Sequence, residues 1–135
     1  MADALIVQVI AGLIRQGRRY LITRRKPGVH LGGMWEFPGG KRETGEAMED
    51  CLRRELREEL NIEVTAPLPY RVVRHAYPGK LVELYVFFCS IEQGQPQALG
   101  CQDFRWVVPE DLHNFEFPPA DKPIIEALTR SRIDT

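Results

Sequence analysis

The stretch that most constrains this chain runs from Phe37 to Ile62, where a turn leads into a long run of helix-forming residues. Pro38-Gly39-Gly40 is a strong turn and loop signal. From about Glu46 to Leu60 the residues favour a helix, and Thr44 is placed to cap its N-terminus. The rest of the chain is therefore expected to fold around one loop–helix unit.

The predicted helix carries three carboxylates on one face. Glu55, Glu58 and Glu59 are spaced i, i+3 and i+4, so they cover an arc of about 100°. The adjacent stripe is leucine-rich and is expected to be buried, whereas the opposite side is charged and is expected to be solvated. The buried stripe is expected to hold Leu52, Leu56 and Leu60. The solvated side is expected to hold Arg53, Arg57, Glu46 and Asp50.

Like charges at this spacing destabilise a helix by a few tenths of a kcal/mol, so the carboxylate face needs a compensating partner. One interpretation is a charged surface helix with Glu–Arg pairs. The other is a divalent-cation site, because Mg²⁺ binds carboxylate oxygens and is usually completed by substrate phosphates. The glycines before the helix favour the second interpretation, because glycine lets backbone groups approach phosphate or metal closely.

Length and composition are those of an ordinary globular protein. The chain has 135 residues, of which 44% are hydrophobic and 27% charged, and we expect a single domain over residues 1–135. The net charge of -1 gives no broad footprint for duplex nucleic acid. The three cysteines lack CxxC spacing and favour a reducing compartment. No segment has the pattern of a membrane span or signal peptide, so a cytoplasmic location is expected.

The remaining sequence alternates between short strands and turns, with one more substantial helix. Strands are expected at residues 5–13, 20–24, 35–37, 63–69, 70–77, 81–91 and 103–108. A helix start is expected at 109–112, and the second helix at 119–130. This order predicts an α/β (α+β) fold in which a mixed β-sheet is sandwiched between helices.

The central stretch resembles the Nudix box, the signature G-x5-E-x7-R-E-U-x-E-E-x-G-U, in which U is a bulky aliphatic residue. The matching residues are Gly40, Glu46, Arg54, Glu55, Leu56, Glu58, Glu59 and Ile62. Asn61 alone departs, standing where the family has glycine. We expect it to end the helix with a positive φ, which Asn tolerates best after glycine.

The resemblance extends beyond the box to the MutT-like branch of the family. Residues 21–25 (LITRR), 31–41 (LGGMWEFPGGK) and 117–125 (FPPADKPII) are similar to segments of that branch. The resemblance implies a Nudix fold and hydrolysis of a nucleoside triphosphate to a monophosphate and pyrophosphate. It implies Mg²⁺ as cofactor, with Mn²⁺ as an alternative, and 8-oxo-dGTP or similar damaged nucleotides as substrates.

The same resemblance assigns expected roles to individual residues. Metal ligands are expected to be the Gly39 carbonyl, Glu55, Glu58 and Glu59. Arg54 is expected to orient Glu55, and the residue that activates water is expected to be Glu55 or, as second choice, Glu58. Glu46 is expected to brace the loop. Candidates for substrate contact are Arg25, Gly40, Lys41 and Asp121, and candidates for base stacking are Phe37, Tyr77 and Phe117.

Two points of this assignment stay open. Asp121 is a candidate for reading the base, but it is equally a candidate cap for the last helix. MutT-like proteins often supply a further Glu from an E-x-Q triplet, whereas this chain has Gly100-Cys101-Gln102. The number of metal ions is therefore open, and the nearby Asp103 is expected to point elsewhere.

Two other functions remain as alternatives. One is hydrolysis of CTP, of 5-methyl-dCTP or of a broad range of nucleoside triphosphates. The other is a non-catalytic Nudix module that binds a nucleotide or damaged DNA, although the intact carboxylate trio argues against it. No stable nucleic-acid partner and no membrane association are expected, and the chain is expected to be a monomer or homodimer.

Overall fold

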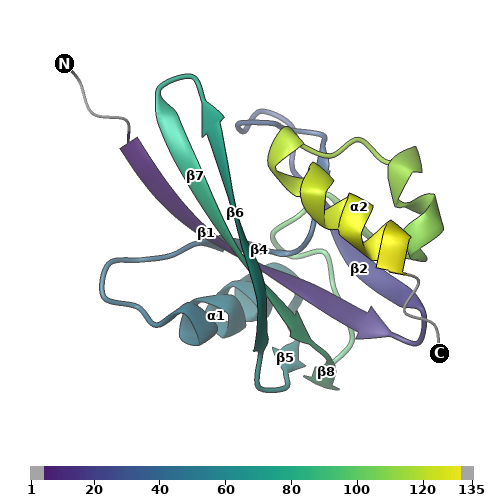
Figure 1. The fold of residues 1–135 in the computed structure, drawn as a ribbon. Coiled ribbons are helices and arrows are strands. Elements are labelled where there is room, and N and C mark those ends of the chain that lie inside the picture. The colour runs from purple at the N-terminus through teal and green to yellow at the C-terminus, as the bar shows by residue number, and fades with distance from the viewer. Residues whose placement is uncertain (1–4, 132–135) are drawn as a thin grey trace.

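The computed structural model describes residues 5–131, which form a mixed β-sheet with helices on both sides (Figure 1). The large sheet contains β1 (Leu5–Gln16), β2 (Arg19–Arg24), β3 (Trp35–Glu36), β4 (Gly39–Lys41), β6 (Leu68–Tyr77), β7 (Lys80–Cys89) and β9 (Asp103–Val107). Its strand order is β3-β2-β1-β7-β6, with β4 paired to β1 and β9 paired to β2. Strands β1 and β7 run parallel and the other pairs are antiparallel.

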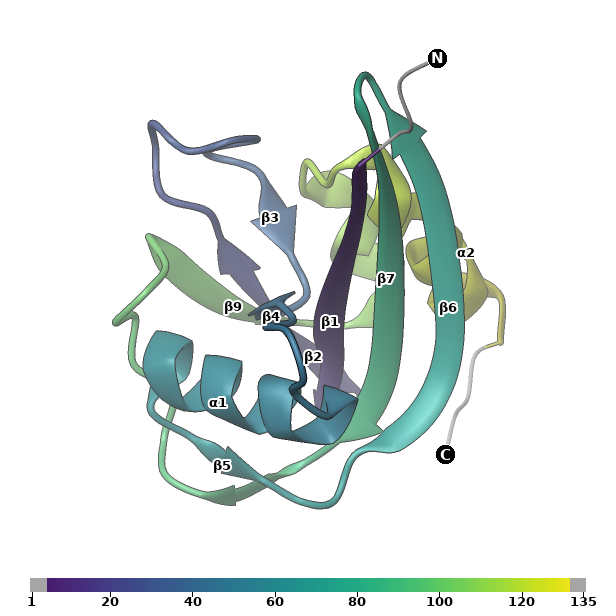
Figure 2. The same ribbon diagram turned by 90° about the vertical axis from the view of Figure 1, so that its left-hand side faces the viewer.

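The helices lie on opposite faces of this sheet (Figure 2). Helix α1 (Met48–Leu60) packs on one face, and α2 (Lys122–Ser131) packs on the other together with the short 3-10 helix η1 (Pro109–Asn114). A second 3-10 helix, η2 (Pro119–Asp121), leads directly into α2. This arrangement confirms the predicted mixed sheet between helices.

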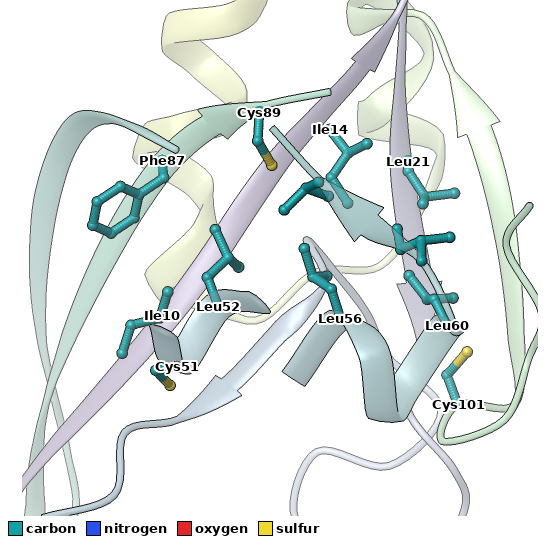
Figure 3. Packing of buried hydrophobic residues seen from close by; sticks show 12 residues of the cluster. Ile10, Ile14, Leu21, Cys51, Leu52, Leu56, Leu60, Phe87, Cys89 and Cys101 are labelled. Carbon is teal, nitrogen blue, oxygen red and sulfur yellow. The ribbon is translucent and has the colours of Figure 1, made fainter. Parts of the chain in front are cut away.

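Two hydrophobic cores follow from the alternation of side chains along β1. Even-numbered residues such as Ile10 and Ile14 face α1, whereas Ala11 and Leu13 face α2. The predicted leucine stripe of α1 is fully buried in the first core, as Figure 3 shows for Leu52, Leu56 and Leu60. The same core holds Cys51, Cys89 and Cys101, all of which are free thiols.

Helix α1 begins later than the sequence suggests. Its first residue is Met48 and its N-cap is Ala47, without a side-chain capping bond, so the predicted cap at Thr44 is wrong. The reason is a turn that precedes the helix: the Glu46 N–H donates to the Glu43 carbonyl, and Gly45 has a φ of 80°. At the other end, Asn61 has a φ of 57° and its N–H donates to Arg57, which confirms the predicted left-handed cap.

Three other predicted elements are divided differently in the structure. The strand expected at 63–69 is interrupted by Pro67, so that β5 (Glu63–Val64) ends early and β6 already begins at Leu68. The strand expected at 81–91 is broken at Ser90, after which β8 (Ile91–Gln93) pairs with β5. The last helix starts at Lys122, because the residues before it form η2.

No helix within residues 5–131 combines the length and the apolar character that crossing a bilayer requires.

Candidate active site

The site is built around β4, a three-residue strand that the sequence indicated only as a loop. Gly39 and Gly40 pair with Ala11 and Ile10 of β1, so the glycine turn is fixed to the centre of the sheet. A Cβ atom at Gly40 would overlap the carboxyl group of Glu55. A Cβ atom at Gly39 would overlap the backbone carbonyl of Ile10. The two glycines therefore let β4 pair closely with β1 while it also contacts α1.

Arg54 joins the loop before α1 to the carboxylates on the helix. Its guanidinium donates two hydrogen bonds to Glu46, from Nε at 2.7 Å and from Nη2 at 3.0 Å. Its Nη1 atom donates to Glu55 at 2.9 Å and to Glu58 at 3.2 Å. A further bond of 3.2 Å reaches the Lys41 carbonyl. Arg54 thus contacts both Glu55 and Glu58, and Glu46, which accepts two of its bonds, is its most closely bound partner.

Glu46 consequently lies elsewhere than on the solvated side of α1. Its side chain is only 15% exposed, and it precedes the first residue of the helix. Its carboxylate also accepts the Glu43 N–H at 3.1 Å, which closes the loop on itself. The hydrogen bond from Arg54 is the largest cause that lowers the pKa of Glu46 to about 2. The contacts of Glu46 with Arg54 and with the Glu43 N–H therefore hold the loop in place before α1.

The three box carboxylates differ in their surroundings. Glu58 is 62% exposed at the edge of the site, whereas the Glu59 carboxylate faces the sheet and accepts the Thr23 hydroxyl at 3.4 Å. Burial, and then the nearby Glu36 and Glu55 charges, raise the pKa of Glu59 to about 8. Burial is also the main cause that raises the pKa of Glu55. Glu55 and Glu59 therefore lie where a positive partner would stabilise their ionised forms.

This carboxylate set suits a hard divalent cation, because it offers oxygen atoms rather than sulfur or imidazole. The side chains are not gathered around one point: among residues 5–131 no three acidic, histidine or cysteine side chains are placed to hold a metal ion together. Glu58 is turned to Arg54 and Glu59 to Thr23.

A pocket of approximately 150 Å³ opens on the other side of β4. Its floor and walls include apolar side chains of the sheet, such as Val9 and Leu84, together with Phe37. The four residues expected to contact substrate also line it: Arg25, Gly40, Lys41 and Asp121. The first and last of them, Arg25 and Asp121, are more than 90 positions apart in the chain, and the fold brings all four to one cavity.

Asp121 is a buried carboxyl group at the inner end of this pocket. It is 6% exposed and is the last residue of η2. Burial, and then the Glu36 charge, raise the pKa of Asp121 to about 8. At neutral pH this side chain is therefore largely protonated, and as a carboxylic acid it both donates and accepts a hydrogen bond.

Glu36 was missed as a site residue by the sequence analysis. It lies between Trp35 and Phe37 on the strand leading into the pocket, and its Oε1 atom accepts from Arg25 Nη1 at 3.1 Å. Burial is the main cause that raises the pKa of Glu36. The available signal was a lone acidic residue inside an apolar run. Arg25 is held by this pair and by a 2.8 Å bond from its Nε atom to the His30 carbonyl.

Two of the three aromatic candidates for base stacking line the pocket, and the third packs behind one of them. Phe37 and Tyr77 line the pocket, whereas Phe117 packs behind Phe37 with a ring separation of 5.4 Å. The Tyr77 hydroxyl accepts the Ala120 N–H at 3.3 Å, so the tip of the β6–β7 hairpin is tied to η2. The edge of the His30 ring approaches Tyr77 at 6.3 Å.

The Gly100-Cys101-Gln102 segment packs on the end of α1. The Gly100 N–H donates to the Glu59 carbonyl at 3.0 Å, and a Cβ atom at Gly100 would lie 3.2 Å from the Glu59 Cα atom. Asp103 forms a 2.7 Å ion pair with Arg105.

Comparison with known proteins gives this geometry a family. The sequence matches the NUDIX domain family over residues 9–127. The CTP pyrophosphohydrolase of Escherichia coli K12 is 32% identical over 127 residues, covering 94% of each chain. The 8-oxo-dGTP diphosphatase of Haemophilus influenzae is 36% identical over 128 residues, covering 93% of each chain. The solution structure of the E. coli ORF135 protein superposes with a TM-score of 0.80 at 31% identity, covering 98% of this chain and 96% of that one.

The fold and the carboxylate helix thus define a Nudix domain, and the chain belongs to the Nudix family. Within the family, the relatives include 8-oxo-dGTP diphosphatases and the structural neighbours include MutT proteins, which confirms the resemblance found in the sequence.

Proposed function

We propose that the protein is a MutT-like Nudix enzyme that hydrolyses nucleoside triphosphates to a monophosphate and pyrophosphate. One observation carries the proposal: β4 is shared by the carboxylate helix and the pocket. The Glu55 carboxyl group lies against one side of Gly40, and the cavity containing Asp121 and Arg25 opens on the other. A nucleotide with its base in the pocket would extend its phosphates along Gly39–Lys41 toward α1.

We propose that a divalent metal, Mg²⁺ with Mn²⁺ as an alternative, is held by the Gly39 carbonyl and by Glu55, Glu58 and Glu59. When bound, Mg²⁺ neutralises phosphoryl charge and lowers the pKa of coordinated water. The fit rests on the oxygen-only donor set and on the two half-buried carboxylates, Glu55 and Glu59, that lie close to other negative charge.

The protein's own contribution to the reaction is positioning. Arg54 holds the Glu55 carboxylate at one oxygen, Oε1, through its 2.9 Å bond. Glu55 is our first choice for the group that accepts a proton from the attacking water, and Glu58 our second. Lys41 and Arg25 are proposed to contact the phosphates, and Gly40 to let them approach the backbone closely, because all three residues line the pocket.

For the base, 8-oxo-dGTP or a similar damaged nucleotide is the favoured substrate. A protonated Asp121 both donates and accepts, which suits the lactam edge of an oxidised guanine. CTP and 5-methyl-dCTP are the second candidate, since an ionised Asp121 would accept from an exocyclic amine and one relative is named a CTP pyrophosphohydrolase. We also propose that residues 1–135 form a single domain and that the protein acts on free nucleotides in the cytoplasm.

The decisive test of catalysis is turnover with Mg²⁺ by wild type, Glu58→Gln and the control Glu49→Gln. Glu49 is an exposed acidic residue in the first turn of the same helix. We expect Glu58→Gln to lose about 10³-fold in kcat, in keeping with removal of a principal charge stabiliser, and Glu49→Gln to lose almost nothing. If wild type and Glu58→Gln are equally inert on every nucleotide while still binding ligand, the protein is a binding module.

A further inference from the structure

A hydrogen-bonded side-chain network lies on the face of the sheet beside α1, outside the pocket and the carboxylate helix. Gln8 of β1 is half-buried between Glu83 of β7 and Arg42, which follows β4. Its Nε2 atom donates to Glu83 Oε1 at 3.2 Å, and its Oε1 atom accepts from Arg42 Nη1 at 2.9 Å. Glu83 also accepts from Tyr85 at 3.1 Å and from Arg74 at 3.0 Å.

Arg42 connects this network to the loop before α1. Its Nε atom donates to the Glu46 carbonyl at 2.6 Å, and its backbone N–H donates to the Gln8 carbonyl at 3.0 Å. Both ends of the residue are therefore bound to β1, while the side chain also reaches the loop. Because a guanidinium is planar with its donors in a fixed fork, these two side-chain bonds fix the distance between Gln8 and Glu46.

The contacts continue without a gap to the catalytic group. Glu46 accepts two bonds from Arg54, at 2.7 and 3.0 Å, and Arg54 donates to Glu55 at 2.9 Å. A continuous series of contacts thus runs from β7 through Gln8, Arg42, Glu46 and Arg54 to Glu55. It runs along the half-buried face of the protein, where charge-assisted bonds are worth more than at an exposed surface.

We propose that Arg42 and Gln8 are positioning residues for the metal-binding carboxylate Glu55. They act by fixing the backbone of Glu46, and Glu46 then sets the guanidinium plane of Arg54. The inference rests on the proposed hydrolase function, but it assigns a role to Gln8, which lies outside the signature, and to Arg42, which occupies one of its variable positions, and neither lines the pocket. Neither Arg42 nor Gln8 is proposed to touch the substrate.

A merely structural network would predict a loss of stability with little effect on Glu55. Outer partners of metal-binding side chains typically change metal affinity or activity by about 10–100-fold when removed. We therefore expect Arg42→Met to lower kcat by at least about 10-fold, with a change in KM below about threefold, because the pocket residues keep their places. Arg42→Lys retains one donor group and is expected to recover part of the loss.

The matched control is Arg57→Met on the same helix. Arg57 donates to Glu63 through bonds of 2.7 and 3.1 Å, so the substitution also removes an arginine bound twice to one partner. Within residues 5–131 the Arg57 side chain donates its hydrogen bonds to Glu63 and contacts neither Arg54 nor Glu55 in this way, so we expect the kcat of Arg57→Met to stay within about twofold of wild type. Gln8→Met removes the bonds to Arg42 and Glu83 together and is expected to reproduce the Arg42→Met effect in weaker form.

Two measurements do not depend on turnover. The first is the affinity for Mn²⁺ alone, followed by electron paramagnetic resonance, which we expect to weaken by about 10-fold in Arg42→Met and to be unchanged in Arg57→Met. The second is hydrogen exchange of the Arg54 Nε–H in the metal-free protein, followed by NMR. We expect faster exchange in Arg42→Met, because the acceptor Glu46 is released.

The outcomes separate this inference from the proposed function. If wild type hydrolyses no nucleotide, the hydrolase proposal fails, and the Mn²⁺ and Arg54 exchange measurements still test the series of contacts. If Arg42→Met keeps the kcat, the Mn²⁺ affinity and the Arg54 exchange rate of wild type, Arg42 and Gln8 do not position Glu55. If Arg42→Met unfolds at a lower denaturant concentration while its kcat, Mn²⁺ affinity and Arg54 exchange rate are unchanged, the network only stabilises the fold, and the positioning role is likewise overturned.

Discussion

At the scale of the residue, the most consequential side chain in the pocket is Asp121. Its carboxyl group is almost completely removed from water and lies in the field of Glu36, which raises its pKa to about 8. The pocket therefore presents a neutral acid at pH 7 and an acceptor-only carboxylate above pH 8. Any preference among bases that depends on this residue is expected to change across that range.

This pKa shift gives a prediction on stability. An unfolded Asp121 loses its proton near its ordinary pKa of 3.8, whereas the folded protein keeps it up to about pH 8. The unfolded state therefore binds fewer protons, and this contribution to stability decreases as pH rises from about 4 to about 8. Asp121→Asn lacks the titrating group, so we expect it to lose less unfolding free energy than wild type between pH 5 and pH 9. Urea titrations at several pH values measure this difference, and equal slopes in the two proteins would contradict the assignment.

At the scale of the element, β4 determines whether the carboxylate helix and the pocket meet. We predict that Gly40→Ala lowers kcat/KM by at least about 10-fold, because its methyl group takes the place of the Glu55 carboxyl group. The protein is expected to remain folded, since the end of the Glu55 side chain is free to move aside. Steady-state kinetics and thermal unfolding of the same sample test both parts.

Gly39→Ala provides the comparison. Its Cβ atom would meet the backbone carbonyl of Ile10 rather than the end of a side chain, so β4 must separate from β1. We expect a loss of stability of about 1–3 kcal/mol or more. If Gly40→Ala is the more destabilising of the two and retains full activity, Glu55 does not lie on Gly40 as described.

The sequence predicted elements well where a local pattern was long, and poorly where distant pairing decided. Helix α1 was recognisable from its leucine stripe and carboxylate spacing, and Asn61 was recognisable as its end. Strand β4 was not, because three residues with two glycines have no strand pattern and become a strand only by pairing with β1. The start of α1 was misplaced, because the cap of a helix depends on the turn at Gly45 before it.

At the scale of the whole molecule, two cores share one sheet, and we propose that they unfold together. Leu56 of α1 is fully buried in the core on one face of the sheet, and Ile124 of α2 is fully buried in the core on the opposite face. We predict that Leu56→Ala and Ile124→Ala each cost about 2–5 kcal/mol and shift a single transition. Denaturant unfolding followed by both far-UV circular dichroism and tryptophan fluorescence measures this. Non-coincident transitions in either variant would show two independently unfolding units.

The candidate site shows the same division between local and distant information. The Nudix signature predicted the carboxylate-bearing helix and the glycine turn before it, because all its residues lie within one short stretch of the chain. Glu36 and the pocket position of Tyr77 depend on β3, the β6–β7 hairpin and η2 meeting over the sheet. The spacing of residues along the chain does not predict that these elements lie together, so placing Glu36 and Tyr77 at the pocket required the fold.

The measurement that tests the central claim most directly is pyrophosphate release by the purified protein with Mg²⁺. It compares kcat/KM for 8-oxo-dGTP, dGTP, CTP and 5-methyl-dCTP. We predict turnover that yields pyrophosphate and a monophosphate, with a preference of about 10²-fold or more for 8-oxo-dGTP over dGTP, equivalent to about 2.7 kcal/mol of discrimination. A preference for the cytosine nucleotides would retain the hydrolase and reassign the pocket. No pyrophosphate from any nucleotide would contradict the proposed function itself.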